Sequence, residues 1–277
     1  MVLTLHSTEQ ERSGKGRAGS ISAQIGAAEK AAVKGASLVI VPHSSTGQHV
    51  IDQYNADPDM VVVIPHVFEG KSKNALSDSS DVKRWFGLNQ HSPIVLFAGE
   101  ISHAAGADIM VEAIPTVSRN HGTAQFVFAG EGPLKGELES RVHHSGMGNK
   151  CRFVGDLSSK NFQALLMASD FVVIPARTWQ DEGLARMAIE NGKPVLTTQQ
   201  AGIGCVNHGE NGLVTFDNPG SIVWGMQELL ANPLHGSMLR VVARKNAGES
   251  GSFETVAAQH YMYYELVLKM HGGKNNV

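Results

Sequence analysis

Residues 94–130 read IVLFAGEISHAAGADIMVEAIPTVSRNHGTAQFVFAG, and this stretch decides the fold class. Short apolar runs rich in Val and Phe stand at residues 94–99 and 124–130, with a longer amphipathic segment between them. A buried strand, a helix and a second buried strand make a βαβ unit, in which the two strands lie parallel. The stretch therefore predicts α/β layers built on a parallel sheet.

The same alternation continues toward the carboxyl end of the chain. Further strands are expected at residues 152–155, 171–176, 194–198 and 212–216, with helical segments in every gap except the last. Because crossovers between parallel strands are right-handed, such strands form a doubly wound sheet whose ligand site lies at their carboxyl ends. Ligand-binding residues are thus expected in the loops after Gly99, Gly130, Ala176 and Thr198.

The first third of the chain shows a shorter version of this pattern. Strands are expected at residues 2–6, 37–43 and 61–66, and helices at residues 22–35 and 45–56. Residues 68–81, FEGKSKNALSDSSD, are polar and lack an apolar period, so they are interpreted as a linker. We therefore expect a partial α/β domain at residues 1–80 and a Rossmann-like domain at residues 81–250.

Two closing helices are expected, at residues 219–232 and 253–270. The second carries a face of Tyr, Met and Leu side chains, which favours packing against another layer. We expect residues 251–277 to pack back toward the first domain.

Composition excludes several classes of protein. The 277 residues are 42% hydrophobic and 18% charged with a net charge of −3, so the chain can bury a core but has no basic field for nucleic acid. Two cysteines are too few for a disulfide framework, and no apolar run is long enough to span a bilayer. The first residues, MVLTLHSTEQ, lack the features of a signal peptide, so a cytoplasmic protein with reduced thiols is expected.

Six segments of the second domain, in order, carry a resemblance to a known family. They are FAGEISHAAGADIMVEAIP, FVFAGEGPLKGELE, CRFVGDLSSKNFQALLMASDFVVIPA, ENGKPVLTT, QQAGIG and HGENGLVTFDNPGSI. They resemble the donor-binding domain of family 4 glycosyltransferases (glycosyl transferases group 1), which have the GT-B fold. The earlier segments TLHSTEQERS, EKAAVKGASLVIVPHSSTGQHVIDQY and DPDMVVVIPH are similar to the end of that family's acceptor-side domain. The resemblance implies a GT-B-like chain with a complete C-terminal domain and a shortened N-terminal part.

The resemblance also implies a function. Such enzymes move a sugar from a nucleotide-sugar donor to a carbohydrate or other hydroxyl acceptor, usually with retention and without a metal or cofactor, the nucleotide-sugar being a substrate. The alternative hypothesis is a non-catalytic GT-B-like module that binds a nucleotide, a sugar or a partner protein, because the N-terminal part is short. A partner could then complete that part of the fold.

Glycines after the first two strands of the second domain are the expected cradle for the donor diphosphate. Gly99, Gly106 and Gly130 let backbone N–H groups approach a phosphate near a helix start, and Glu131 follows in the same loop. Gly130 also fits a simple tight turn.

The expected cations are missing from this cradle. Where the resemblance implies an Arg and a Lys that hold the diphosphate, this chain has Glu100 and Ala105. Like charges about 4 Å apart repel by roughly 4 kcal/mol at an effective dielectric near 20, so Glu100 disfavours donor binding. Arg177, at the end of its strand, is the candidate replacement, with an ion pair to Asp181 or Glu182 as the alternative.

The resemblance also implies two glutamates eight positions apart, one near the transferred sugar and one on the donor ribose. Glu182 and Glu190 have this spacing, whereas alignment without gaps places Trp179 and Met187 there instead. The structural alternative is that Glu182 is a charge at a helix N-terminus and Glu190 a solvated helix residue.

Histidine and cysteine residues complete the candidates. The resemblance implies that His6 reaches the leaving-group side of the donor, while a surface role is the alternative. His143 and His144 are adjacent on a helix and point apart, so no metal site is expected there. Cys205 has no neighbouring base and is interpreted as a spectator thiol. The resemblance therefore implies a site with His6 and Glu182 as the catalytic residues. The residues expected to bind the donor are Gly99, Glu100, Gly106, Gly130, Glu131, Arg177 and Glu190.

Overall fold

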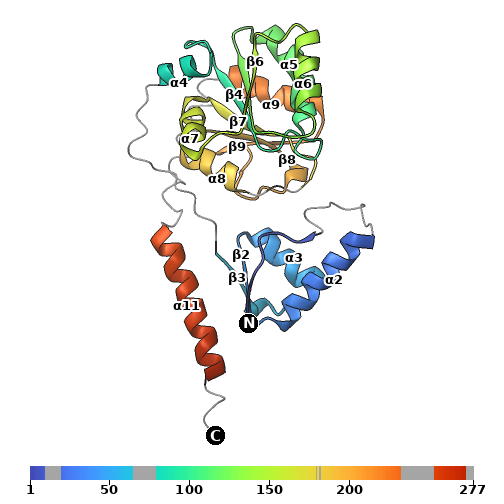
Figure 1. Ribbon diagram of the computed structural model, residues 1–277, viewed down its shortest axis with the longest axis vertical. Helices are drawn as coiled ribbons and strands as arrows, with labels where there is room; N and C mark the ends of the chain where they lie inside the picture. Colours follow the sequence, from blue (N-terminus) through green and yellow to red (C-terminus); the bar gives the residue numbers. More distant parts are fainter. Residues whose placement is uncertain (10–19, 65–78, 179, 181, 232–252, 273–277) are drawn as a thin grey trace. The chain divides into compact units, whose positions relative to one another are not determined.

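The computed structural model describes residues 1–9, 20–64, 79–178, 180, 182–231 and 253–272 (Figure 1). The chain divides into two compact units. One unit comprises Met1–Glu69 together with Ser250–Val277, and the other comprises Gly70–Glu249. Each unit has its own parallel sheet, which places the chain among α/β proteins.

The second unit is built on a six-stranded parallel sheet, as predicted. Its strand order is β6-β5-β4-β7-β8-β9. The strands are β4 (Ile94–Ala98), β5 (Gln125–Ala129), β6 (Cys151–Gly155), β7 (Phe171–Ile174), β8 (Val195–Thr198) and β9 (Gly212–Thr215). The chain winds outward from β4 to β6, then returns to the other side of β4 and winds outward from β7 to β9. This is the doubly wound order, and its switch point lies between β4 and β7.

Helices cover both faces of this sheet (Figure 1). Side chains of α5 (Ala107–Asn120), α6 (Lys135–His144) and α9 (Pro219–Ala231) join one core cluster. Side chains of α7 (Ser159–Ala168) and α8 (Gly183–Glu190) join the other, and α4 (Ser79–Trp85) packs beside α7. Only the 3₁₀ turn η2 (Gln199–Ala201) lies between β8 and β9, in agreement with the predicted gap.

Alternation along each strand explains the two cores. In β4, Val95 and Phe97 belong to the first cluster, whereas Ile94 and Leu96 belong to the second. Successive side chains of a strand point to opposite faces, so a strand covered by helices on both sides is apolar throughout. The apolar runs that predicted the fold are therefore a consequence of two-sided burial.

The first unit has a three-stranded parallel sheet in the order β1-β2-β3. Its elements are β1 (Val2–Thr4), α2 (Ser20–Gly35), β2 (Leu38–Val41), α3 (Ser44–Tyr54), the 3₁₀ turn η1 (Pro58–Met60), β3 (Val61–Val63) and α11 (Phe253–Gly272). Val256, Tyr263 and Val267 of α11 pack against the apolar face formed by Leu38 and Ile40. The C-terminal helix thus contributes to the core of the N-terminal sheet.

Several predicted strands are too long at their carboxyl ends. The strand predicted at residues 37–43 ends at Val41, and the strand predicted at residues 171–176 ends at Ile174. Pro42 and Pro175 follow directly, and proline has no N–H to donate to a neighbouring strand. The ring also restricts the residue before it, so the ladder stops there.

The predicted linker at residues 68–81 is partly wrong. Helix α4 begins at Ser79, so the last three residues of that segment are helical, and residues 68–78 lie outside the described residues. The helix was missed because only Val82 of its seven residues is buried, which leaves no apolar period to detect. Among the described residues, no helix is both long enough and apolar enough to cross a membrane.

Candidate functional site

The loops after β4, β5 and β7 meet at the switch point of the six-stranded sheet. Gly106 has a φ of 74° at the start of α5, and a Cβ at this position would overlap the carbonyl oxygen of Pro175. Gly130 has a φ of 133°, and a Cβ there would overlap the carbonyl oxygen of Gly99. Glycine is required at both positions because the backbone is left-handed or nearly so and because neighbouring backbone leaves no room. The two glycines allow the three loops to pack directly on one another.

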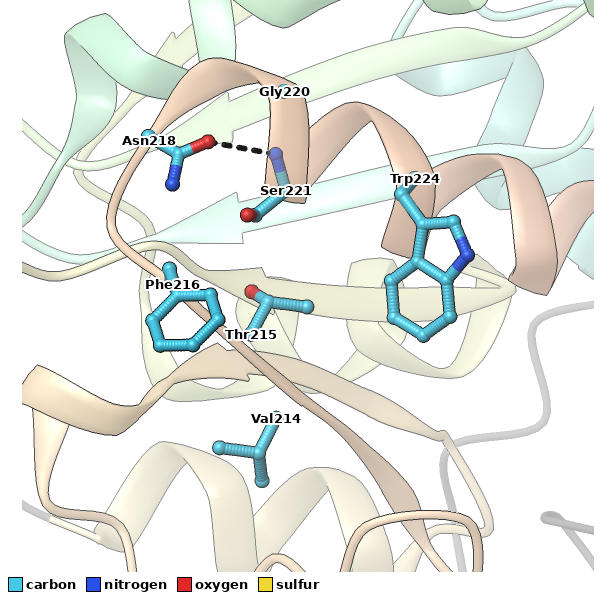
Figure 2. A pocket seen from close by; sticks show the side chains of 7 residues that line it. All are labelled: Val214, Thr215, Phe216, Asn218, Gly220, Ser221 and Trp224. Atoms are coloured by element: carbon cyan, nitrogen blue, oxygen red, sulfur yellow. Dashed lines mark hydrogen bonds between the residues drawn. The ribbon is translucent and has the colours of Figure 1, made fainter.

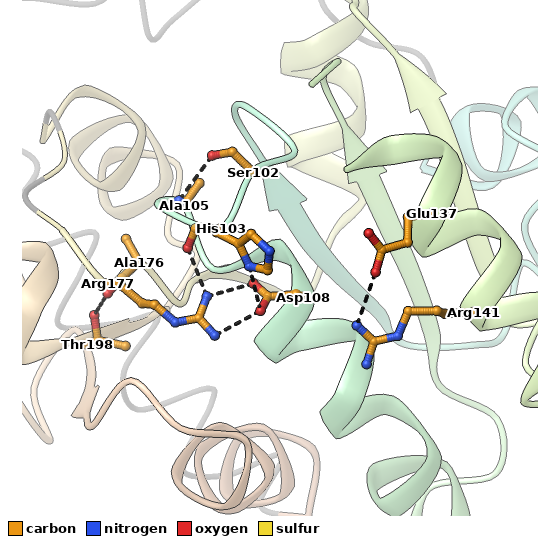
Figure 3. A network of polar contacts seen from close by, with 9 residues as sticks. All are labelled: Ser102, His103, Ala105, Asp108, Glu137, Arg141, Ala176, Arg177 and Thr198. Carbon is orange, nitrogen blue, oxygen red and sulfur yellow. Dashed lines mark hydrogen bonds and ion pairs between the residues drawn. The ribbon is translucent and has the colours of Figure 1, made fainter. Parts of the chain in front are cut away.

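An ion-pair network joins the first and third of these loops (Figure 3). Both terminal nitrogens of Arg177, which follows β7, donate to Asp108 in α5, at 2.7 and 2.8 Å. Arg177 Nη1 also donates to the carbonyl oxygen of His103 at 2.8 Å, and His103 Nδ1 lies 3.1 Å from Asp108 Oδ2. Bidentate pairing of this kind fixes the guanidinium in position as well as attracting it.

This network shifts the pKa of both partners. Burial acts to raise the pKa of Asp108, but the hydrogen bonds and charges of Arg177 and His103 outweigh it and hold that pKa below its ordinary value. The hydrogen bond to Asp108 raises the pKa of Arg177, and the charges of Asp217 and Glu112 add to this effect. The guanidinium therefore stays protonated, and one carboxylate, that of Asp108, is in direct contact with it.

The sequence did not predict the partner of Arg177. The two predicted partners were a donor diphosphate and a carboxylate of Asp181 or Glu182. In the structure Arg177 forms its ion pair with Asp108. Glu182 pairs with Arg186 instead, and Asp181 lies outside the described residues. An Asp in the first turn of α5 suits the helix dipole, and this is the only sequence signal that marks Asp108.

Glu100 and Ala105 occupy different environments in the same loop. Gly99 and Glu100 are exposed, whereas Ala105 is buried and its backbone N–H donates to Ser102 Oγ at 3.3 Å. The position where the resemblance implies a Lys thus faces the interior in this chain, while the carboxylate of Glu100 reaches solvent.

Glu131 lies beside a cation that the sequence analysis did not single out. Its carboxylate accepts a hydrogen bond from Lys135 Nζ at 2.6 Å, and this contact raises the pKa of Lys135. Glu131 follows Gly130, so the loop after β5 carries an exposed ion pair rather than an isolated carboxylate.

Glu182 lies at the N-terminus of α8, where the structural alternative placed it, and its side chain is buried. It is only 3% exposed and precedes α8. One carboxylate oxygen accepts from the backbone N–H of Gly204 at 2.7 Å, and the other accepts from Arg186 at 2.8 and 3.1 Å. The side chain therefore fastens the start of α8 to the loop after β8, a long-range contact that helix-start statistics do not capture.

Glu190 ends α8 and is half-buried, as is Met187 one turn earlier. Eight residues of helix rise about 12 Å, so Glu182 and Glu190 lie at opposite ends of α8. Trp179, the other candidate for the first glutamate position, lies outside the described residues.

His6 belongs to the first unit and lies just beyond β1, where it is exposed. The predicted strand at residues 2–6 ends at Thr4, although Leu5 N still donates to the carbonyl oxygen of Ile40 at 2.9 Å. His6 therefore occupies a loop position that follows the carboxyl end of the strand, and its proposed reach to the donor stays a prediction.

No metal centre is found in the part of the chain that the structure describes. No three His, Cys, Asp or Glu side chains there are grouped closely enough to hold a metal ion. The rings of His143 and His144 have centroids 6.2 Å apart and planes at 83° to one another.

Both cysteines are free thiols, as predicted. Burial raises the pKa of each thiol to about 12, and for Cys205 the Glu182 carboxylate contributes as well. Since the thiolate is the reactive form, we expect both cysteines to react slowly with iodoacetamide at pH 8 in the native protein and rapidly in 6 M urea. Mass spectrometry of Cys151→Ser and Cys205→Ser variants separates the two sites. Fast native alkylation of either site would contradict the assignment.

The Asp108 network predicts a specific dependence of stability on pH. Because the folded-state pKa of Asp108 is lowered, the unfolded chain takes up a proton first as the pH falls below about 4. The stabilisation is complete above that pH and is lost as the pH falls through the lowered pKa. We expect the difference in free energy of unfolding between the wild type and Asp108→Asn to shrink in urea titrations as the pH falls below about 4. A difference independent of pH would show that Asp108 is not ionised in the fold.

The fold and the site together define a class of protein. A doubly wound parallel sheet with glycine-dependent loops at its switch point is a Rossmann-like α/β architecture, in which ligands bind outside the carboxyl ends of the strands. Residues 78–249 match the family described as glycosyl transferases group 1. The chain belongs to this family.

Known relatives agree with this assignment over nearly the whole chain. An uncharacterized glycosyltransferase of Methanocaldococcus jannaschii is 26% identical in an alignment 277 positions long, which covers 98% of this chain and 70% of that protein. Glycogen synthase of Mycobacterium tuberculosis is 24% identical in an alignment 271 positions long, which covers 95% of this chain and 62% of the enzyme. The chain thus spans about two thirds of the length of these relatives.

Solved structures show the same fold. Sucrose-phosphate synthase from Thermosynechococcus elongatus superposes with a TM-score of 0.79 at 20% identity, covering 97% of this chain and 68% of that one. The Anabaena protein HepE, in complex with UDP-glucose, superposes with a TM-score of 0.79 at 18% identity, covering 95% of this chain and 71% of that one. These similarities confirm the predicted GT-B-like fold.

Proposed function

We propose that this chain is the donor-binding part of a retaining, metal-independent family 4 glycosyltransferase, which moves a sugar from a nucleotide-sugar to an acceptor hydroxyl. Membership of the group 1 family supports glycosyl transfer. The observation that carries the proposal is the switch point, where the Gly99 and Gly130 loops, the start of α5 and Arg177 converge. The binding of UDP-glucose by the Anabaena neighbour supports a donor of this class.

In this proposal Arg177 supplies the positive charge that Glu100 and Ala105 do not. The Arg177 side chain is 35% exposed, and Asp108 and the His103 carbonyl hold its guanidinium at the carboxyl ends of β4 and β7. A fixed cation stabilises a diphosphate leaving group without having to reorganise as charge develops. Gly99, Gly106 and Gly130 would bring backbone N–H groups to the phosphates.

The remaining roles follow from position along the chain. Glu190, half-buried at the end of α8, would bind the donor ribose. Glu182 and His6 are proposed to lie near the transferred sugar, with Glu182 oriented by Arg186 and Gly204.

A thermal-shift titration with UDP, ADP, GDP and their glucose conjugates tests the proposal. A ligand at 100 times its Kd stabilises a folded protein by about 2.7 kcal/mol, which is a measurable shift in Tm. We expect one diphosphate series to produce this shift and Arg177→Met to abolish it. Arg141→Met is the matched control, because Arg141 lies on α6 and pairs only loosely with Glu137, at 3.9 Å.

A second candidate is a non-catalytic module that binds a nucleotide, a sugar or a partner protein. Glu100 lies in the loop that is expected to bind the donor diphosphate. Arg177 is paired with Asp108, and the charges of Glu112 and Asp217 also act on it. These carboxylates repel a diphosphate. No Tm shift with any of the six ligands at millimolar concentration would favour this module over the transferase.

A further inference from the structure

A pocket outside the expected donor cradle lies at the edge of the six-stranded sheet (Figure 2). It has a volume of about 390 Å³ and lies between the carboxyl end of β9 and the first turns of α9. Its lining residues are Val214, Thr215, Phe216, Asn218, Gly220, Ser221 and Trp224. Small-molecule sites occupy about 300 to 1,000 Å³ and combine apolar walls with a few polar groups, so both its size and its lining fit a small ligand.

Two aromatic side chains of this pocket are exposed. Phe216 is 55% exposed and Trp224 is 44% exposed. Large aromatic rings normally bury most of their surface, because burial of 150–250 Å² is their main contribution to stability. The ring of His208 lies nearly parallel to the indole of Trp224, with an interplanar angle of 9° and ring centroids 6.4 Å apart. The pocket therefore presents two exposed aromatic side chains to solvent.

Polar groups stand beside these rings. Asn218 Oδ1 accepts a hydrogen bond from Ser221 N at 2.9 Å, which caps the first turn of α9. Within the described residues, neither Asn218 Nδ2 nor Ser221 Oγ has a hydrogen-bond partner. The cap fixes the amide orientation, so a donor and a hydroxyl are available to a ligand next to the aromatic walls.

The free edge of β9 does not favour an added peptide strand. β9 is the last strand of the sheet, yet its Val214 N–H already donates to His208 Nδ1 at 3.0 Å. An added strand would need that N–H group, and β9 has only four residues to pair. A compact ligand fits this pocket better than an extended peptide.

We propose that this pocket is a carbohydrate-binding subsite. A pyranose ring has C–H faces that suit the negative π faces of Trp224 and Phe216, and hydroxyl edges that suit Asn218 and Ser221. β9 lies two strands from β7, which corresponds to about 10 Å across the sheet, and Asp217 in the pocket loop acts electrostatically on Arg177. The subsite is thus close enough to the candidate donor crevice to hold part of a saccharide acceptor. That acceptor role rests on the proposed function, whereas saccharide binding does not.

Equilibrium binding without any donor tests the subsite. In a Trp85→Phe/Trp179→Phe variant Trp224 is the only tryptophan, and its fluorescence can be titrated with maltose, cellobiose, lactose and N,N′-diacetylchitobiose. We expect a saturable change with at least one disaccharide. Calorimetry on the otherwise native chain should show that Trp224→Ala or Phe216→Ala weakens binding about tenfold or more, and that Trp85→Ala, an exposed tryptophan outside the pocket, does not.

Asn218→Asp provides a variant that keeps the fold. Aspartate retains the capping oxygen but loses the Nδ2 donor, so the Tm should stay constant while saccharide affinity falls several-fold. Binding by none of the four disaccharides, or binding unchanged in Trp224→Ala and Phe216→Ala, would overturn the proposal. Binding of anilinonaphthalene sulfonate without any disaccharide would identify an apolar site instead. If the protein binds disaccharides but no nucleotide-sugar, the subsite proposal is supported and the proposed transferase function is contradicted.

Discussion

Gly106→Ala is expected to lower the free energy of unfolding by about 3 kcal/mol or more, which is a large fraction of the stability of a domain. Gly106 has a φ of 74°, which L-residues with a Cβ avoid, and the new methyl group would overlap the carbonyl oxygen of Pro175. The obstacle is backbone, which no side-chain rotation can relieve. Urea unfolding followed by circular dichroism measures the effect.

Gly136→Ala is the matched control for this substitution. Gly136 lies in α6 of the same unit, and a Cβ there would have open space around it. Alanine is favoured over glycine in helices by up to about 1 kcal/mol, so this variant should be neutral or slightly more stable. Equal stability of Gly106→Ala and Gly136→Ala would show that the loops after β4 and β7 are not packed as described.

Glu182→Ala should lower the free energy of unfolding by about 3 kcal/mol. The carboxylate is buried, and its removal leaves the Gly204 N–H and the Arg186 guanidinium without their acceptor. Water can replace part of the hydrogen bonding that Arg186 loses, because that side chain is 29% exposed. Urea unfolding of the wild type and the variant measures this loss.

Glu182→Gln and Arg186→Met separate the structural role from a chemical one. Glutamine keeps an oxygen for Gly204 and should recover about half of the stability lost in Glu182→Ala. If Glu182 also acts on the transferred sugar, Glu182→Gln should lose transfer activity while Arg186→Met loses mainly stability. Full stability of Glu182→Ala would contradict the anchoring role of the carboxylate.

The architecture of the second unit was predictable from local patterns. Each of its six strands is a short apolar run, and every predicted run overlaps an observed strand. The ends were less accurate, because Pro175 ends a strand that hydropathy alone extends, as Pro42 does in the first unit. Helix α4 was missed because it buries a single residue.

The convergence of the loops was predictable from the sequence, whereas the ion pairing within them was not. The loops after Gly99, Gly130 and Ala176 do meet at the switch point, as the strand order requires. The partner of Arg177 was not predictable, since Asp108 lies 69 positions earlier and several carboxylates compete for one guanidinium. The aromatic pocket of Phe216 and Trp224 was also missed. A sequence does not show whether an aromatic side chain is exposed or buried.

The sequence by itself determined the α/β layers, the parallel strands, the family and the loops in which a site would form. All of these depend on the period and order of residue types along the chain, which local geometry converts into strands and helices. Only the tertiary structure decided that Arg177 pairs with Asp108, that Glu182 anchors the Gly204 loop and that Phe216 and Trp224 face solvent. These features depend on distances between residues far apart in sequence, and such distances are set by how the layers pack.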